Sequence, residues 1–341
     1  MVTQSAAPGE LLFLDRNDVN AALDAGPCLE RVEDTFRWVG DGRVQQSNPF
    51  DLDVSDHDDE YGLGMVQSFP SYVEPLAVAG HKWLGYYERN ATRDLPTINA
   101  INVLSDAQTS LPLAIIEGQS VTAMRTAGHA AVGAKYLARP DSSVVTIVGC
   151  GDQGRTHLAM MNELFDLERV HACDIDDEIR TGFVEEMSEA SDAEIVGYTD
   201  AREAVSGTDV VCTVTSATTP IVKEAWIEPG THVAATAGFY DMEPTLSSEA
   251  DKWVVGWYER DLSWIEGEHE DNWTAEGYAV DDADIHGDLT EVMAGDVSGR
   301  ESDDERTVMT HKGMPALDTA TMDLVYEQAT ESGLGTSLSL F

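Results

Sequence analysis

A short apolar stretch that runs into three glycines constrains the fold of this chain more than any other feature. Residues 144–148 read Val-Val-Thr-Ile-Val, and the next six residues form the pattern Gly-x-Gly-x-x-Gly. Gly149 permits a tight turn, Gly151 lets the backbone approach a diphosphate, and Gly154 lets a helix pack closely on the strand. Residues 155–165 are compatible with that helix, whose first amides would face the phosphates.

A carboxylate at a suitable distance supports a dinucleotide site at this turn. A second strand-like stretch, 169–173, ends at Asp174, twenty residues after Gly154. A carboxylate there would accept hydrogen bonds from ribose hydroxyls. A glycine turn in an ordinary strand–helix unit is the alternative, and the strand, helix and acid together favour the dinucleotide. No basic residue stands between Asp174 and Arg180 to meet a 2′-phosphate, so we expect NAD in preference to NADP.

The charge balance of the chain is strongly acidic. Its 341 residues include 63 acidic and 20 basic side chains, which gives a formal net charge of −43. The acids are spread along the chain, and its tryptophans and apolar strands distinguish it from a disordered acidic protein. We interpret the charge as a halophilic surface whose self-repulsion is screened at high salt. It argues against nucleic acid and anionic membranes as partners.

Length and cysteine usage narrow the class further. A chain of 341 residues is expected to form two domains. No metal-binding spacing of Cys or His is present, and the acidic segment 51–60 is interpreted as a solvated loop rather than a cation site. We expect no metal. No secretory leader or membrane-length apolar run is found, so a cytoplasmic location is expected. The cysteines are widely separated and expected to be free: Cys28, Cys150, Cys173 and Cys212.

The remaining pattern predicts an α/β fold. The N-terminal part is rich in strands, expected at 11–14, 62–70, 76–88, 97–104 and 111–116, with helices at 17–23 and 29–39. A helix at 122–138 is followed by strands at 144–148, 169–173, 195–197, 209–215 and 231–236. Strands that alternate with helices in this way indicate a parallel, doubly wound sheet. A strand at 308–310 and a helix at 316–329 are expected at the end.

Several stretches resemble the ornithine cyclodeaminase/μ-crystallin family, of which this would be an acidic, haloarchaeal-type member. They are Gly80-His81-Lys82, Leu95-Pro96-Thr97, residues 112–118, residues 122–127, the turn at 149–154, Gly230-Thr231-His232, Gly299-Arg300 and residues 313–318. The resemblance implies a substrate-binding and dimerisation domain built from residues 1–121 and 317–341. It implies a central Rossmann domain at 122–316 and NAD(P)-linked chemistry at the α-carbon of an amino acid.

The resemblance also implies roles for individual residues. Lys82 and Arg125 match the family's ligands for the substrate carboxylate, which two fixed cations suit. Positions near the cofactor are matched by Thr97 and again by Arg125. Residues that match the lining of the dinucleotide site, beyond the three glycines, are Asp152, Gln153, Asp174 and Thr215. Because Asp152 is awkward beside phosphates, we expect its side chain to turn away or to cap the helix.

The chain departs from the family pattern at the third carboxylate-binding arginine. Aligned from Gly42, that position falls on Pro49. Lys312 is one candidate replacement. If the alignment is displaced, Arg43 is the missing arginine instead.

A second departure concerns the acid–base group that serves the substrate nitrogen. The family's aspartate position falls on Phe239, and Asp241 could take the role if the loop bulges. The usual Ser-Val pair near the end is replaced by His311 and Lys312, which are competent acid–base groups, and His311 is also expected near the cofactor. The alternative is that this subgroup uses a different substrate and that the sequence of this loop has diverged.

These observations predict a homodimeric oxidoreductase or deaminase that uses NAD at the α-carbon of an amino or imino acid. Ornithine cyclodeaminase-like and alanine dehydrogenase-like reactions both fit. A cyclic imino acid (ketimine) reductase is a further alternative. So is a non-catalytic NAD(P)- and ligand-binding protein of the μ-crystallin kind.

Overall fold

The computed structural model describes residues 9–54, 64–217, 219–236, 241–268 and 284–340. The chain forms two compact units. Unit 1 comprises residues 1–125 and 314–341, and unit 2 comprises residues 126–313. The observed division after Arg125 and the expected one after residue 121 both fall inside helix α3 (Gly118–Leu137).

Unit 2 is built on one parallel sheet. Its strands lie in the order β10-β9-β8-β11-β12-β15-β13-β14. They are β8 (Val144–Val148), β9 (Arg169–Cys173), β10 (Glu194–Tyr198), β11 (Val210–Thr213), β12 (His232–Ala235), β13 (Lys252–Val255), β14 (Ile285–Asp288) and β15 (Thr307–Thr310). The chain winds outward through β9 and β10 on one side of β8 and through β11 and β12 on the other. The predicted doubly wound sheet is therefore confirmed, with its switch point between β8 and β11.

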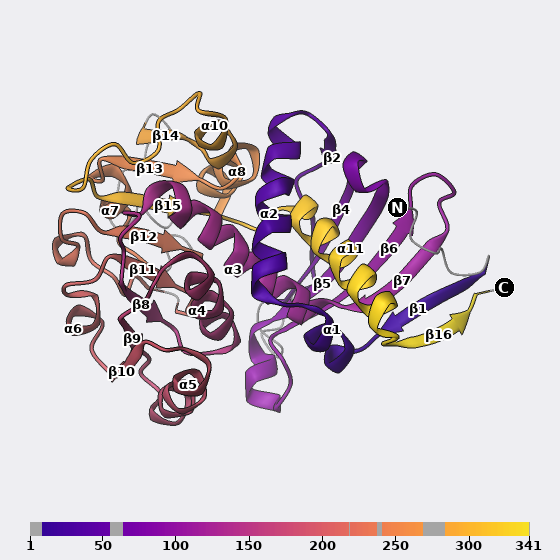
Figure 1. The fold of residues 1–341 in the computed structure, drawn as a ribbon, viewed down its shortest axis with the longest axis horizontal. Helices are drawn as coiled ribbons and strands as arrows, with labels where there is room; N and C mark the ends of the chain where they lie inside the picture. Colours follow the sequence, from indigo (N-terminus) through magenta and orange to yellow (C-terminus); the bar gives the residue numbers. More distant parts are fainter. Residues whose placement is uncertain (1–8, 55–63, 218, 237–240, 269–283, 341) are drawn as a thin grey trace. The chain divides into compact units, whose positions relative to one another are not determined.

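Helices cover both faces of this sheet (Figure 1). They are α4 (Asp152–Leu164), α5 (Asp177–Ala190), α6 (Ala201–Val205), η3 (Glu224–Trp226), α7 (Pro244–Ser248), α8 (Tyr258–Glu268) and α10 (Leu289–Ala294), with the second part of α3. On one face, Val211 and Val233 pack in a core with Val205 of α6 and Leu246 of α7. Strands covered on both sides are expected to be buried along their whole length, as β11 and β12 are.

Several short elements between β12 and β15 were not predicted from the sequence. Strands β13 and β14 and helices α7, α8 and α10 all lie there. The two strands have four residues each, too few to show a period, and β13 buries a lysine, Lys252. Strands predicted at 209–215 and 231–236 are shorter than expected, because β11 and β12 end where the chain leaves the sheet.

Unit 1 joins the two ends of the chain in a second sheet, with order β16-β1-β7-β6-β5-β4-β2 and β3 paired to β4. Its strands are β1 (Glu10–Leu14), β2 (Val44–Gln46), β3 (Phe50–Asp53), β4 (Gly64–Val73), β5 (Val78–Tyr87), β6 (Ile98–Asp106), β7 (Pro112–Glu117) and β16 (Thr336–Ser339). Its helices are α1 (Arg16–Ala22), α2 (Ala25–Gly40), η1 (Glu74–Leu76), η2 (Glu88–Arg93) and α11 (Pro315–Ser332). The loop predicted at 51–60 is wrong for residues 51–53, which belong to β3; residues 55–63 lie outside the described residues.

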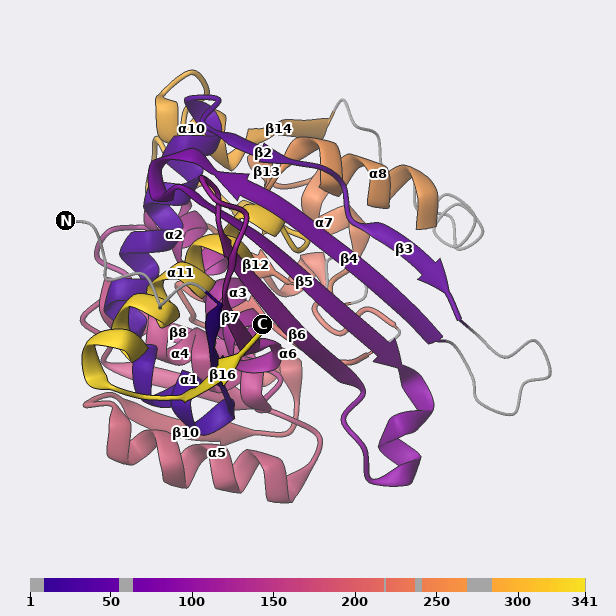
Figure 2. The ribbon, with the colours of Figure 1, turned by 90° about the vertical axis from the view of Figure 1, so that its right-hand side faces the viewer.

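The two faces of the unit 1 sheet differ. Helix α11 lies across β4 and β5 on one face, beside α2 (Figure 1). Figure 2 looks onto the other face, where no described helix of this unit crosses β4, β5 and β6. Because side chains alternate along a strand, that second face carries Phe13, Trp83 and Ile101, which are 39%, 44% and 45% exposed. It is an apolar surface left open within unit 1.

Candidate functional site

Three charged side chains meet in the interior of unit 1. The ammonium of Lys82 lies 2.8 Å from Oδ2 of Asp318, and Nε of Arg125 donates to Oδ1 of the same carboxylate at 2.8 Å. The side chains of Lys82 and Asp318 are fully buried, and that of Arg125 is 5% exposed. The two side chains expected to bind the substrate carboxylate, Lys82 and Arg125, therefore both contact the carboxylate of Asp318. The cluster carries one excess positive charge when all three groups are ionised.

The sheet and α11 together position this cluster. Lys82 stands at the centre of β5 on the face beneath α11, next to Phe69 of β4 and Asn102 of β6 in the strand register. Its ammonium lies 4.2 Å from the centre of the Phe69 ring. Asp318 comes from the first turn of α11, which approaches β5 so closely that a side chain at Gly80 would overlap Thr319. Gly80 is thus needed for the close contact between α11 and β5.

Burial changes the chemistry of Lys82. Loss of solvation, with the nearby charge of Arg125, lowers the pKa of Lys82 to about 7, and Asp318 opposes that shift. Neighbouring Asn102 is also fully buried, and both polar atoms of its side-chain amide lack a hydrogen-bond partner among the described residues. A buried amide is rarely left in this state, so a polar group of a bound molecule fits beside Asn102 and Lys82.

The glycine turn of unit 2 has the shape of a phosphate cradle. Gly149 adopts φ +105°, and a Cβ there would lie 2.7 Å from the carbonyl oxygen of Val214. Gly151 is the N-cap of α4, makes no side-chain cap, and has open space where a Cβ would be. At Gly154 a Cβ would overlap the carbonyl of Gly149. The first amides of α4 are therefore accessible to an anion.

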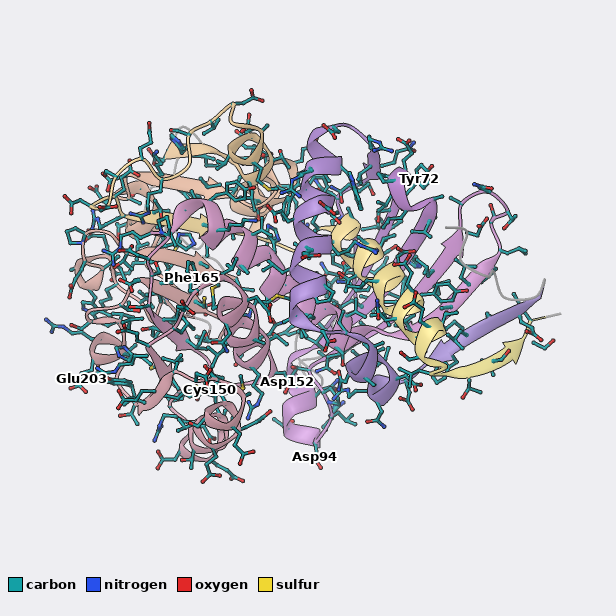
Figure 3. The ribbon with its side chains drawn as sticks, in the orientation of Figure 1. Tyr72, Asp94, Cys150, Asp152, Phe165 and Glu203 are labelled. Atoms are coloured by element: carbon teal, nitrogen blue, oxygen red, sulfur yellow. The ribbon has the colours of Figure 1, made fainter. Side chains whose placement is uncertain are left out.

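Polar groups around the turn also fit a dinucleotide. Asp174 accepts from the amides of Cys150 and Asp176, both at 2.9 Å, which holds its carboxylate against the turn. The side-chain oxygen of Gln153 is buried without a partner among the described residues. Asp152 is exposed and does not cap the helix, because Gly151 occupies the cap. Figure 3 labels Cys150 and Asp152, which precede and follow that glycine in the sequence.

Two other predicted site residues of unit 2 lie in contact. The hydroxyl of Thr215 donates to Oδ1 of Asp241 at 2.5 Å, and Asp241 is fully buried. Thr215 follows β11, and Asp241 follows β12, so both stand beyond the carboxyl ends of central strands. Ligands bind at that edge in open α/β sheets. Phe239 lies outside the described residues.

His311 and Lys312 follow β15 but have different surroundings. The ring of His311 stacks on that of His129, with centroids 4.1 Å apart. The hydroxyl of Thr236 lies 3.3 Å from Nε2 of His311. Lys312 instead interacts electrostatically with Asp261, a buried carboxyl on α8. Burial raises the pKa of Asp261 to about 7, opposed by an amide hydrogen bond from Trp257 and by the charge of Lys312.

Asp261→Asn should change the pH dependence of stability. Folded Asp261 keeps its proton up to a pH of about 7, whereas the unfolded side chain releases it near 3.8, so wild type loses stability across that interval. The variant should escape this loss, which amounts to about 1.4 kcal/mol for each unit by which the pKa is raised. Urea unfolding in molar KCl from pH 4 to 8 measures the difference. A constant difference would show that Asp261 does not titrate abnormally.

The other predicted residues are placed as follows. Thr97 is half-buried directly before β6, and Pro49 is buried directly before β3, both in unit 1. Arg43 is exposed and pairs with Glu74 at 3.3 Å. The sequence did not identify Asp318 as the partner of Lys82 and Arg125. It also did not identify Asp261 as a neighbour of Lys312. Only Asp318 had a signal, because it ends the family-like segment 313–318.

The described residues contain no group of three or more His, Cys, Asp or Glu side chains arranged to hold a metal ion. None of the described helices combines the length and apolar character that crossing a membrane requires.

The sequence model of the ornithine cyclodeaminase/mu-crystallin family matches residues 10–333. The chain belongs to this family. It is 30% identical to the alanine dehydrogenase of Archaeoglobus fulgidus, over 97% of this chain and 99% of that protein. The structure is similar to that of Thermococcus litoralis Δ1-pyrroline-2-carboxylate reductase in complex with NADH and L-proline. That pair has a TM-score of 0.87 and 31% identity, over 96% of this chain and 99% of the reductase.

A second solved structure has a similar fold. An archaeal alanine dehydrogenase dimer with bound NAD has a TM-score of 0.85 and 28% identity, over 97% of this chain and 100% of that one. The family predicted from the motifs is confirmed, as is the predicted combination of a Rossmann sheet with a second domain.

Proposed function

We propose that this family member is an enzyme that transfers hydride between NAD and the α-carbon of an amino or imino acid. The observation that carries the proposal is the buried pair of cations, Lys82 and Arg125, balanced by the single carboxylate of Asp318. A buried excess positive charge is costly unless an anion joins it, and an α-carboxylate supplies one. Asn102 offers an amide beside the same place.

The glycine turn would hold the cofactor. Amides at the start of α4 would bind the diphosphate, and Asp174 would bind the ribose. Bound NAD supplies a hydride acceptor, or a donor in its reduced form. The likeness to an alanine dehydrogenase with NAD and a reductase with NADH supports this assignment. Thr97, Thr215 and His311 remain proposed neighbours of the cofactor.

Proton transfer at the substrate nitrogen is assigned to a smaller set of groups. Asp241 is buried and accepts from Thr215, and His311 is held by Thr236, so both have fixed positions. Lys312 is near enough to Asp261 for its charge to lower the pKa of that carboxyl, which makes it the weaker candidate. With a pKa of about 7, Lys82 can also give or take a proton near neutral pH.

The reduction of a cyclic imino acid is the second candidate, favoured by the TM-score of 0.87 to a reductase bound to NADH and L-proline. The two reactions are separated by one screen in molar KCl. Amino acids are supplied with NAD⁺ and cyclic imino acids with NADH, and both nicotinamide absorbance and ammonia are recorded. Ammonia with NADH formation indicates an amino-acid dehydrogenase, ammonia without it indicates a cyclodeaminase, and NADH consumption alone indicates a reductase. No turnover of any substrate would contradict the proposal and favour a binding protein.

Arg125→Ala should lower kcat/KM for the substrate at least tenfold. Removing one charge-assisted contact costs about 1.5–3 kcal/mol, and the Lys82–Asp318 pair can keep the fold intact. Arg43→Ala is the matched control, because Arg43 is exposed and pairs with Glu74. Steady-state kinetics and melting temperatures of both variants test the assignment. A loss on Arg43→Ala alone would identify Arg43 as the carboxylate ligand and reject the assignment of Arg125.

Asp174→Ser should weaken NAD binding and relax the preference over NADP. The wild-type carboxylate would repel a 2′-phosphate, and exposed Asp176 and Asp177 would add to this repulsion. Serine can still accept a hydrogen bond from the Cys150 amide, so the turn should survive. Fluorescence titrations with NAD and NADP give both dissociation constants. Tighter binding of NADP than of NAD by wild type would overturn the cofactor assignment.

The open face of the unit 1 sheet supports a homodimer. A contiguous apolar surface that includes Phe13, Trp83 and Ile101 is unusual for a face left in water, and a second copy of the chain would cover it. The similar archaeal alanine dehydrogenase is described as a dimer.

A further inference from the structure

A line of hydrogen-bonding groups runs through unit 2 from the glycine turn to His311. It begins at the backbone carbonyl of Gln153, which lies 2.7 Å from Nδ1 of His157. Nε2 of His157 lies 3.3 Å from the hydroxyl of Thr236, and that hydroxyl lies 3.3 Å from Nε2 of His311. Each link has a donor and an acceptor, and the first link fixes the direction of the others.

His157 can adopt only one form in these surroundings. A carbonyl oxygen only accepts hydrogen bonds, so Nδ1 of His157 must carry the proton and donate it to Gln153. The imidazole is fully buried, and desolvation lowers the pKa of His157 to about 4, so the ring is neutral near pH 7. Its Nε2 therefore carries no proton and accepts a hydrogen bond.

Thr236 transmits this constraint. Its hydroxyl has one proton, and Nε2 of His157 requires it as a donor. The same oxygen can meet His311 only as an acceptor, so Nε2 of His311 must donate to it. If Nε2 of His157 carried the proton instead, its Nδ1 would be unprotonated. Two hydrogen-bond acceptors, Nδ1 of His157 and the carbonyl oxygen of Gln153, would then face each other at 2.7 Å.

The ring of His311 is also held in place. It stacks on His129 with an angle of 39° between the planes. Gly256 adjoins both residues, and a Cβ there would lie 2.7 Å from Cβ of His311 and would overlap the ring of His129. The imidazole of His311 is thus confined by packing as well as by its hydrogen bond.

We propose that His157 and Thr236 are positioning residues that hold His311 as the Nε2–H tautomer, so that Nδ1 is the nitrogen that accepts a proton during turnover. The tautomer is argued from the hydrogen-bond geometry and the burial of His157, whereas its use in turnover rests on the proposed function. Because the line starts at Gln153, in the turn that would bind the cofactor, it links the cofactor cradle to the acid–base group.

The tautomer can be measured without cofactor or substrate. Protein labelled with ¹⁵N-histidine, in molar KCl, gives long-range ¹H–¹⁵N correlations that distinguish a protonated from an unprotonated ring nitrogen, and His311→Gln assigns the signals. We expect wild-type His311 to carry its proton on Nε2. Thr236→Val, which keeps the side-chain shape and removes the hydroxyl, should give a mixture of tautomers, and Thr236→Ser should restore the single form. An Nδ1–H tautomer in wild type, or an unchanged spectrum in Thr236→Val, would overturn the proposal.

Steady-state kinetics test whether Nδ1 of His311 accepts a proton during turnover. Thr236→Val should lower kcat at least tenfold with little change in KM, because a general acid–base group contributes about 10²–10⁴-fold when correctly positioned. Thr236→Ser should remain close to wild type, which loss of packing alone would not explain. Equal kcat in wild type and Thr236→Val would reject the role of His311 as acceptor. If no substrate is turned over at all, the proposed function fails, and the spectra still decide the tautomer.

Discussion

Asp318→Ala should lower the free energy of unfolding by about 3–5 kcal/mol. The substitution leaves the buried cations Lys82 and Arg125 without their shared carboxylate, and breaking a buried pair from one side is much more costly than removing both partners. Urea unfolding in molar KCl measures the loss. Asp318→Asn keeps the volume of the side chain and removes its charge, so it should show most of the same loss.

Asp34→Ala is the control for Asp318→Ala. Asp34 also pairs with an arginine at 2.7 Å, but its side chain is 49% exposed and that of Arg37 is 50% exposed. Exposed pairs contribute at most about 1 kcal/mol, since water already solvates both charges. Equal, small losses for Asp318→Ala and Asp34→Ala would show that the cluster in unit 1 is not held by charge.

The features that could be predicted from the sequence are those with a local signal. The strand, turn and helix from Val144 to Leu164 follow from adjacent apolar residues and glycines. The strand has its expected bounds, and the helix begins three residues before the expected segment and ends one residue before the end of that segment. Lys82 stood out because lysine is scarce and its neighbours are apolar. Burial of that side chain confirms that it is no ordinary surface charge.

The features that could not be predicted depend on contacts between distant parts of the chain. Asp318 lies 236 positions from Lys82 and 193 from Arg125, so its place at the end of the family-like segment 313–318 does not reveal which cations it contacts. His157 is 79 positions from Thr236 and occupies an ordinary core position of α4. Arg300 belonged to a family-like motif, yet only the structure shows it donating to the carbonyl of Leu137 at the end of α3.

The chain has a net charge of −43, and most charged side chains of its described residues lie outside the core. Few charged side chains of the described residues are buried: Glu33, Lys82, Arg125, Asp241, Lys252, Asp261, Asp288, Asp318 and Asp323. Helix α5 illustrates the surface, since it begins with Asp177 and Glu178 after an acidic cap, Asp176. Like charges so close together repel one another unless ions screen them.

We therefore expect the fold to require high salt. At about 1 M salt the screening length is about 3 Å, and at about 0.1 M it is about 10 Å, long enough for neighbouring surface acids to repel. Dilution of the protein from molar KCl into about 0.1 M KCl should unfold it or separate a dimer into single chains. Circular dichroism follows unfolding, and sedimentation gives the mass of the assembly at each salt concentration.

A neutral osmolyte separates screening from a general effect on hydration. Sucrose added at low salt strengthens the burial of apolar surface but leaves the charges unscreened, so it should restore much less stability than KCl. A melting temperature independent of KCl concentration would contradict the expectation. Full rescue by sucrose would show that stability is limited by the apolar surfaces of the protein, including the open sheet face with Trp83 and Ile101, and not by repulsion between its acids.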